Sequence, residues 1–171
     1  MASWMLPTKA LNMIRERLPK GSAILELGSG EGTVELGKDY NIFSIEHNID
    51  YCANLKSICY HVPLSMGWYD RDMLEIVLPS IPEYDLLIID GPPGNVSNRS
   101  NFMNHLDLFD ISRNILIDDI HRPDEGKLFM NLLFKGGRDA IIQTAGDGRV
   151  FAWIKARKTS HRNHEDIVSN E

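Results

Sequence analysis

Three aspartates stand directly after two apolar segments, where side chains of this type can bind a cation or accept a proton. Asp90 follows Tyr84–Ile89, and Asp118 and Asp119 follow Ile115–Ile117. If both segments are parallel strands, their carboxyl ends meet at the edge where α/β sheets bind ligands. Three carboxylates gathered there repel one another unless a cation lies between them. Oxygen ligands of this kind suit Mg²⁺ or a similar divalent ion.

The same aspartates admit two other interpretations. Without a metal, Asp90 and Asp119 would orient a cofactor or an acceptor and act as catalytic groups. In a structural role, Asp118 would cap the next helix and Asp119 would pair with Arg122. If a base is needed, the candidates are Asp119, His121 and His105.

A second chemical feature is the glycine pattern Gly28-x-Gly30-x-Gly32, which follows the apolar run Ala23–Leu27. Glycine lets the backbone turn sharply and lets a cofactor approach where a Cβ would clash. Glu46 ends the next apolar run, 18 residues after Gly28 (46 − 28). An acid at this place accepts hydrogen bonds from ribose hydroxyls in folds of this kind.

The charge of the glycine loop indicates which cofactor it suits. A pyrophosphate favours helix-terminal N–H groups and disfavours a nearby anion, whereas S-adenosylmethionine carries an ammonium and a sulfonium. Glu26 and Glu31 make the loop acidic, and its third glycine is Gly32 rather than residue 33, which is Thr33. The loop therefore favours the methyl donor. Nicotinamide binding is the rival interpretation, and a structural turn cap is the alternative for Glu26.

The segment Ile24-Leu25-Glu26-Leu27-Gly28-Ser29-Gly30-Glu31-Gly32 resembles motif I of the class I S-adenosylmethionine-dependent methyltransferases, and Ser44-Ile45-Glu46-His47 resembles the acidic motif after it. The order of elements resembles that family over roughly residues 7 to 155. Trp68 lies where such enzymes contact the adenine, although Trp68 and Tyr69 could equally be a core pair. The resemblance implies these cofactor-binding residues: Glu26, Gly28, Ser29, Gly30, Gly32, Glu46, His47, Trp68 and Asp90.

The segment Asp90-Gly91-Pro92-Pro93-Gly94, followed by Ile117-Asp118-Asp119-Ile120, resembles metal-dependent O-methyltransferases. That resemblance implies a metal held by Asp90, Asp118 and Asp119 that binds two neighbouring hydroxyls of the acceptor. The chain departs from the catechol type, because Pro93 and Gly94 stand where a basic residue would assist deprotonation. Arg99 could recognise an acidic or hydroxylated acceptor, or be a solvated loop residue.

The apolar pattern predicts the elements that must position these residues. Helical periodicity covers 7–18, 50–56, 70–78 and 124–134, and short apolar runs predict strands at 23–27, 42–45, 84–89, 115–117, 140–142 and 150–154. Alternating strands and helices predict a Rossmann-like three-layer α/β/α sandwich with a mostly parallel sheet. Asp147-Gly148 before the last strand predicts an antiparallel edge hairpin. We expect one domain over 1–155 and a polar, disordered tail over 156–171.

Composition narrows the class of partner. The net charge of −6 argues against nucleic acid, because phosphate binding needs a basic surface. No apolar run approaches the roughly 20 residues that span a bilayer, and the first residues are not a signal peptide. We therefore expect a cytoplasmic protein without a membrane partner, with Cys52 and Cys59 as free, reduced thiols.

These observations predict methyl transfer from S-adenosylmethionine to an oxygen of a small hydroxylated molecule, with or without a divalent metal, in a protein that could form a homodimer. The alternative is a cofactor-binding module without independent catalysis, either a sensor or a subunit that a partner completes. Transfer to nitrogen or to a protein is less favoured, because Asp90-Gly91-Pro92-Pro93 lacks the aromatic of the usual amino-methyltransferase signature.

Overall fold

The computed structural model of the chain describes residues 5–52 and 57–157. Its main sheet contains β1 (Ala23–Leu27), β2 (Asn41–Glu46), β3 (Ile58–His61), β6 (Leu86–Ile89), β7 (Asn114–Ile117), β8 (Ala140–Thr144) and β9 (Val150–Ile154). A separate hairpin contains β4 (Leu64–Ser65) and β5 (Trp68–Tyr69). The α-helices are α1 (Thr8–Arg17), α2 (Glu31–Leu36), α3 (Ile49–Cys52), α4 (Arg71–Val77) and α5 (Pro123–Gly136), and the 3₁₀ helices are η1 (Leu78–Ser80) and η2 (Arg99–Leu108).

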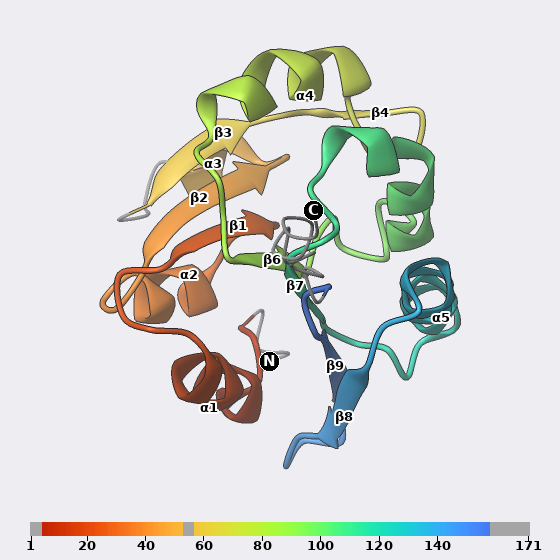
Figure 1. Ribbon diagram of the computed structural model, residues 1–171. Coiled ribbons are helices and arrows are strands. Elements are labelled where there is room, and N and C mark those ends of the chain that lie inside the picture. Colours follow the sequence, from red (N-terminus) through yellow and green to blue (C-terminus); the bar gives the residue numbers. More distant parts are fainter. Residues whose placement is uncertain (1–4, 53–56, 158–171) are drawn as a thin grey trace, which may run out of the picture.

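The seven strands lie in the order β3-β2-β1-β6-β7-β9-β8 between two layers of helices (Figure 1). The five strands from β3 to β7 are parallel to their neighbours. The last two are not, because β9 pairs antiparallel with both β7 and β8. The predicted three-layer sandwich, with a mostly parallel sheet and an antiparallel edge hairpin, is confirmed.

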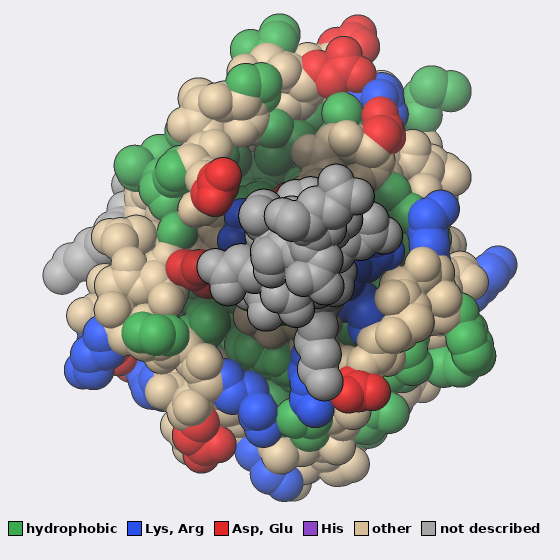
Figure 2. Space-filling view, in the orientation of Figure 1, with side chains coloured by type: hydrophobic (Ala, Val, Ile, Leu, Met, Phe, Trp, Pro, Cys, Tyr) green, Lys and Arg blue, Asp and Glu red, His purple; other side chains and the backbone are tan. Residues whose placement is uncertain are grey.

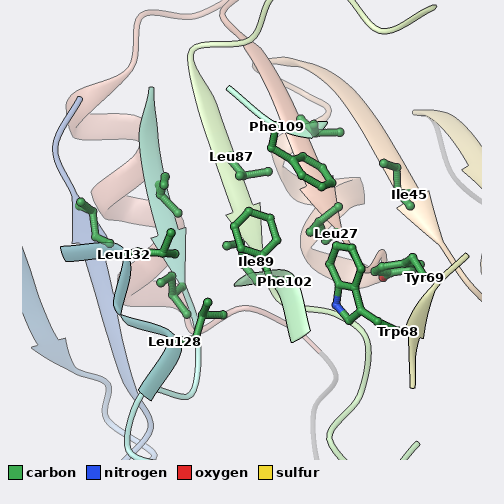
Figure 3. Close-up of a cluster of buried hydrophobic side chains, with 14 of the residues drawn as sticks. Leu27, Ile45, Trp68, Tyr69, Leu87, Ile89, Phe102, Phe109, Leu128 and Leu132 are labelled. Atoms are coloured by element: carbon green, nitrogen blue, oxygen red, sulfur yellow. The ribbon is translucent and has the colours of Figure 1, made fainter. Parts of the chain in front are cut away.

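Side-chain alternation along the strands divides the core into two clusters, because successive residues of a strand face opposite sides of the sheet. On β1, Leu25 and Leu27 face the layer of α4, η2 and α5, whereas Ile24 faces α1 and α2. Figure 3 shows the first cluster, in which Trp68 and Tyr69 lie beside Leu27. Strands buried on both faces explain why their sequences are continuous apolar runs.

Helix ends agree with the sequence pattern. The helix predicted over 70–78 is α4, and the Asp70 side chain caps it by accepting a hydrogen bond from the Met73 amide at 2.9 Å. Gly137 ends α5 in the left-handed conformation, with φ of 55°, as glycine commonly does after a helix. The helix predicted over 50–56 is α3, which begins at Ile49 and ends at Cys52; residues 53–56 lie outside the described residues.

The prediction of free, reduced cysteines is wrong. Cys52 at the end of α3 and Cys59 on β3 form a disulfide, with their Cα atoms 5.4 Å apart. The crossover from β2 to β3 brings the two positions within the usual range for a disulfide. The two cysteines are only seven residues apart in the sequence. Their pairing could be expected only if Cys59 were known to lie on a strand beside α3, and the sequence pattern did not identify β3.

The predicted boundary between domain and tail falls near the end of the described residues. The amides of Ala156 and Arg157 donate hydrogen bonds to Asn114 Oδ1 and to the Ser112 carbonyl. These two residues are therefore attached to the segment that begins β7, while residues 158–171 lie outside the described residues. Among the helices of the described part, none is long and apolar enough to cross a membrane.

Candidate functional site

The carboxyl ends of the central parallel strands border a cleft of ≈ 1090 Å³. Its walls come from the glycine loop after β1, the turn after β2, the segment from Asp90 to Arg99, the end of β7, the start of α5 and the turn before β9. Figure 2, in the orientation of Figure 1, shows acidic and basic side chains interspersed over the visible surface. Polar and charged lining residues include Ser29, Glu46, His47, Asn48, Asp90, Arg99, Asp118, Asp119, Glu125 and Arg149.

Two glycines let the ends of β1 and β6 approach each other beside the cleft. Gly28 has φ of 86°, and a Cβ at this position would lie 2.9 Å from Gly91 Cα. A Cβ on Gly91 would lie 2.7 Å from both Gly28 Cα and the Tyr69 hydroxyl. Gly32 differs, because a Cβ there would make an ordinary 3.5 Å contact with Leu6. The first glycine of the pattern is thus required by close packing between strand ends.

Glu46 joins the glycine loop to the turn after β2. Its side chain is buried, and Oε2 accepts hydrogen bonds from the amide and hydroxyl of Ser29 at 2.9 and 3.1 Å. Its Oε1 accepts from the Asn48 amide at 2.8 Å and lies 2.7 Å from His47 Nδ1. Glu46, Ser29 and His47 all line the cleft, so the structure brings these predicted cofactor residues together.

Glu26 lies beneath the loop, on the side of α2. Its Oε1 accepts hydrogen bonds from the hydroxyls of Thr33 at 2.5 Å and Ser44 at 2.6 Å, and Thr33 Oγ1 also accepts from the Gly30 amide at 3.0 Å. Burial raises the pKa of Glu26 to about 7, although both hydroxyls lower it. Glu26 does not line the large cleft; it borders a small cavity of ≈ 10 Å³ under the glycine loop, room for about one water.

The three aspartates do gather at the carboxyl ends of β6 and β7, and all three line the cleft. The Asp90 side chain is 28% exposed, whereas those of Asp118 and Asp119 are 1% and 7% exposed. Burial, together with the two other aspartates, raises the pKa of Asp90 to about 8 against the opposing effect of Arg99. Burial and Asp119 likewise raise the pKa of Asp118 to about 6.

Asp119 adopts φ of 61°, a conformation that non-glycine residues rarely adopt and that occurs often at functional sites. Its Oδ2 lies 2.9 Å from Arg122 Nη1, which matches the ion pair considered from the sequence. Asp118 does not cap α5, whose first turn has no side-chain cap; its Oδ2 lies 3.5 Å from Arg149 Nη1. The capping interpretation of Asp118 is therefore wrong.

A buried arginine lies among these acids. Arg99 begins η2, and its side chain is only 5% exposed. Its guanidinium lies 3.5 Å from Asp90 Oδ1, 3.7 Å from Asp119 Oδ2 and 3.8 Å from Glu125 Oε1. Its Nε also donates a hydrogen bond to the Pro92 carbonyl at 3.1 Å. The interpretation of Arg99 as a solvated loop residue is wrong.

Three residues proposed from the sequence lie elsewhere. Trp68 is buried in the core against Phe102 and Phe109 (Figure 3), so the structure places it as the core alternative describes. His105 packs on the Trp68 ring, with centroids 4.5 Å apart. His121 is exposed, and its Nδ1 accepts a hydrogen bond from the Val150 amide at 3.3 Å. Neither histidine is among the residues that line the cleft.

Sequence reasoning missed Glu125 and Arg149, which line the cleft. In the sequence, Glu125 looks like an acid in the first turn of a helix, and Arg149 looks like a residue of the turn before the last strand. Neither position indicates a place in the cleft. Tyr69 is buried beneath Gly91, its hydroxyl has no hydrogen-bond partner among the described residues, and burial raises its pKa well above the ordinary value.

The chain matches none of the protein-family models and none of the curated proteins compared with it. It is similar in structure to solved methyltransferases. A Staphylococcus aureus structure assigned as a caffeoyl-CoA O-methyltransferase is 15% identical, with a TM-score of 0.56 over 86% of this chain and 81% of that one. A chain of the E. cuniculi Mtq2–Trm112 complex, responsible for methylation of the eRF1 translation termination factor, is 15% identical, with a TM-score of 0.54 over 91% and 100%.

A third similar structure contains ligands. The MycE methyltransferase of the mycinamycin pathway, in complex with Mg, S-adenosylhomocysteine and mycinamycin VI, is 13% identical, with a TM-score of 0.54 over 89% of this chain and 50% of that one. Identities this low show a shared fold. The fold is therefore that of the Rossmann-like methyltransferases, and the activity has to be argued from the site.

Proposed function

We propose that this chain is an S-adenosylmethionine-dependent methyltransferase that acts on an oxygen of a small hydroxylated molecule. The observation that carries the proposal is Glu46, which ends β2, lines the cleft and is hydrogen-bonded to the glycine loop. An acid at this place, beside a glycine turn in a methyltransferase fold, is where the ribose of the methyl donor binds. The mixed charges on the face in Figure 2 support a small acceptor over nucleic acid.

The site residues fit the methyl donor. Two of the four groups that contact Glu46 are the side chains of Ser29 and His47, which can rotate away when ribose hydroxyls arrive, while the Ser29 and Asn48 amides keep the carboxylate in place. The bound donor supplies a methyl group already activated on a sulfonium. The protein then contributes mainly by holding an acceptor oxygen in line with that methyl group.

The end of β7 offers polar atoms that suit a hydroxylated acceptor. Within the described part of the chain, Arg99 Nη1, Asp118 Oδ1 and Asp119 Oδ1 are buried without a hydrogen-bond partner. Such atoms carry a large penalty unless a ligand or water satisfies them, and a hydroxyl group can both donate and accept. Asp90 is the most exposed aspartate of the three, so it is our candidate for accepting the proton of the acceptor hydroxyl.

The donor set does not fit the divalent ion that one interpretation of the sequence places here. Across residues 5–52 and 57–157, no group of three or more His, Cys, Asp or Glu side chains is placed to hold a metal ion. The Arg99 guanidinium lies among the same carboxylates that were expected to be ligands.

Substitution of Glu46 tests the proposed cofactor. Glu46→Ala should weaken binding of S-adenosylhomocysteine by roughly 1.5–3 kcal/mol for each charged hydrogen bond that is lost. Isothermal calorimetry measures the affinity, and a melting curve checks that the variant folds. Glu35→Ala, at an acid on α2 that does not line the cleft, is the matched control. Unchanged affinity, or tighter binding of a nicotinamide dinucleotide, would contradict the assignment.

A second candidate is a cofactor-binding subunit that a partner completes. It is favoured by the similarity to a chain of the Mtq2–Trm112 complex, which this chain covers over its whole length. Under this alternative, the purified protein binds S-adenosylhomocysteine but transfers no methyl group from labelled donor to any member of a panel of hydroxylated compounds. Turnover by the chain alone would rule the alternative out.

A further inference from the structure

The carboxylates at the ends of β6, β7 and the start of α5 surround a single guanidinium. Asp90, Asp119 and Glu125 come from three different elements, and each has an oxygen within 3.8 Å of an Arg99 nitrogen. Asp119 and Glu125 are almost as deeply buried as Arg99 itself. The three acids thus border one buried cation, and Asp119 also pairs with the half-exposed Arg122 at 2.9 Å.

Burial makes these partners depend on one another. A charge moved out of water into protein carries a penalty of several kcal/mol, which only close opposite charges and hydrogen bonds offset. Arg99 has both, because its Nε also donates to the Pro92 carbonyl, which anchors the guanidinium to the segment after Asp90. Removing the arginine would take away the most deeply buried of the cations that offset these carboxylates, and would leave Asp119 paired with the half-exposed Arg122.

We propose that Arg99 takes the place of the divalent metal: its guanidinium is the resident cation that gathers Asp90, Asp119 and Glu125 at the cleft. A metal ion would need the same carboxylate oxygens and would be repelled by the guanidinium between them. Arg99 accordingly acts on these acids by neutralising their charge within the protein. This inference does not depend on methyl transfer, and its test uses no activity measurement.

The first measurement is a metal titration of the unaltered protein. The melting temperature should be the same with Mg²⁺, with Mn²⁺ and with chelator, because a ligand stabilises a fold only if it binds the folded state. A metal-dependent rise that Asp119→Asn abolishes would overturn the proposal. A rise that Asp119→Asn leaves intact places the ion elsewhere, and the double-mutant cycle below then decides.

The second measurement is a double-mutant cycle on Arg99 and Glu125. Arg99→Gln should lower the melting temperature, and adding Glu125→Gln should recover part of the loss, because the second change removes a charge that the first left unpaired. The matched control is the exposed pair of Arg113 and Glu83, 3.1 Å apart, whose two substitutions should be additive within error. Additive losses at Arg99 and Glu125 would refute the shared-cation arrangement.

The proposal can still be tested if the Arg99→Gln variant does not fold. In that case the double variant alone is compared with Glu125→Gln. Folding of the double variant supports the proposal, because neutralising the acid then rescues loss of the arginine. A double variant that also fails to fold overturns it, because neutralising Glu125 then rescues nothing.

Discussion

The ionisation of the buried Glu26 carboxyl should make the free energy of unfolding depend on pH. This side chain is 3% exposed beneath the glycine loop, and burial raises its pKa from an ordinary value of 4.5 to about 7. Below pH 4.5 the group is protonated in both the folded and the unfolded chain. Between pH 4.5 and about 7 the folded chain retains a proton that the unfolded chain has released, so the free energy of unfolding falls as the pH rises. Above pH 7 the loss is complete.

Comparing the Glu26→Gln variant with the unaltered protein isolates the part of this pH dependence that comes from Glu26. Glutamine stays uncharged at every pH, and its carbonyl can still accept hydrogen bonds from Thr33 and Ser44. Each unit by which the pKa of Glu26 differs between the folded and the unfolded chain corresponds to about 1.4 kcal/mol. The free energy of unfolding of the variant should therefore rise by about 3 kcal/mol relative to that of the unaltered protein between pH 4.5 and pH 8. Denaturant unfolding followed by circular dichroism at several pH values measures this gain.

An exposed acid provides the control. Glu16→Gln on α1 removes the same charge from the surface, and its stability difference should change little over the same pH range. Parallel pH profiles for Glu26→Gln and the unaltered protein would refute the reasoning, since they would mean that the buried carboxyl ionises as readily as an exposed one.

Two further predictions follow from the packing of the chain. Gly91→Ala should destabilise the fold by about 1–3 kcal/mol in denaturant unfolding, because its Cβ would lie 2.7 Å from Gly28 Cα and the Tyr69 hydroxyl. Gly146→Ala, where nothing lies within 4 Å, is the control, and an equal effect at both glycines would contradict the argument. A chain that ends at Arg157 should melt within a few degrees of the full chain and bind S-adenosylhomocysteine equally well, because residues 158–171 are mostly polar. A large loss of either property would show that the segment docks on the domain.

The central sheet could be predicted because its signal is local. Runs such as Tyr84–Ile89 and Ile115–Ile117 are apolar throughout, as strands covered on both faces require. β3 lacks that signal, because it is an edge strand whose Ile58 is 56% exposed. Because the sequence pattern does not predict β3, it could not predict the pairing of Cys52 with Cys59 either.

The glycine loop and Glu46 could be predicted for a different reason. Their places beside each other follow from the order of strand, turn and helix, which fixes where the end of β2 lies relative to the end of β1. Trp68 had no such constraint. An aromatic residue after β3 can face the cleft or the core, and only the packing of Phe102 and Phe109 from η2 places Trp68 inside.

The cation of the acidic cluster illustrates where sequence reasoning stops. The repulsion among Asp90, Asp118 and Asp119 favours a positive charge nearby, but the sequence does not say which one. Arg99 lies nine residues after Asp90 in a polar segment, and nothing local distinguishes it from a solvated arginine. Its burial arises because η2 packs against α5, whose first turn brings Glu125 to the guanidinium. A metal ion and an arginine can each offset this repulsion, so only the arrangement of these elements in space can tell them apart.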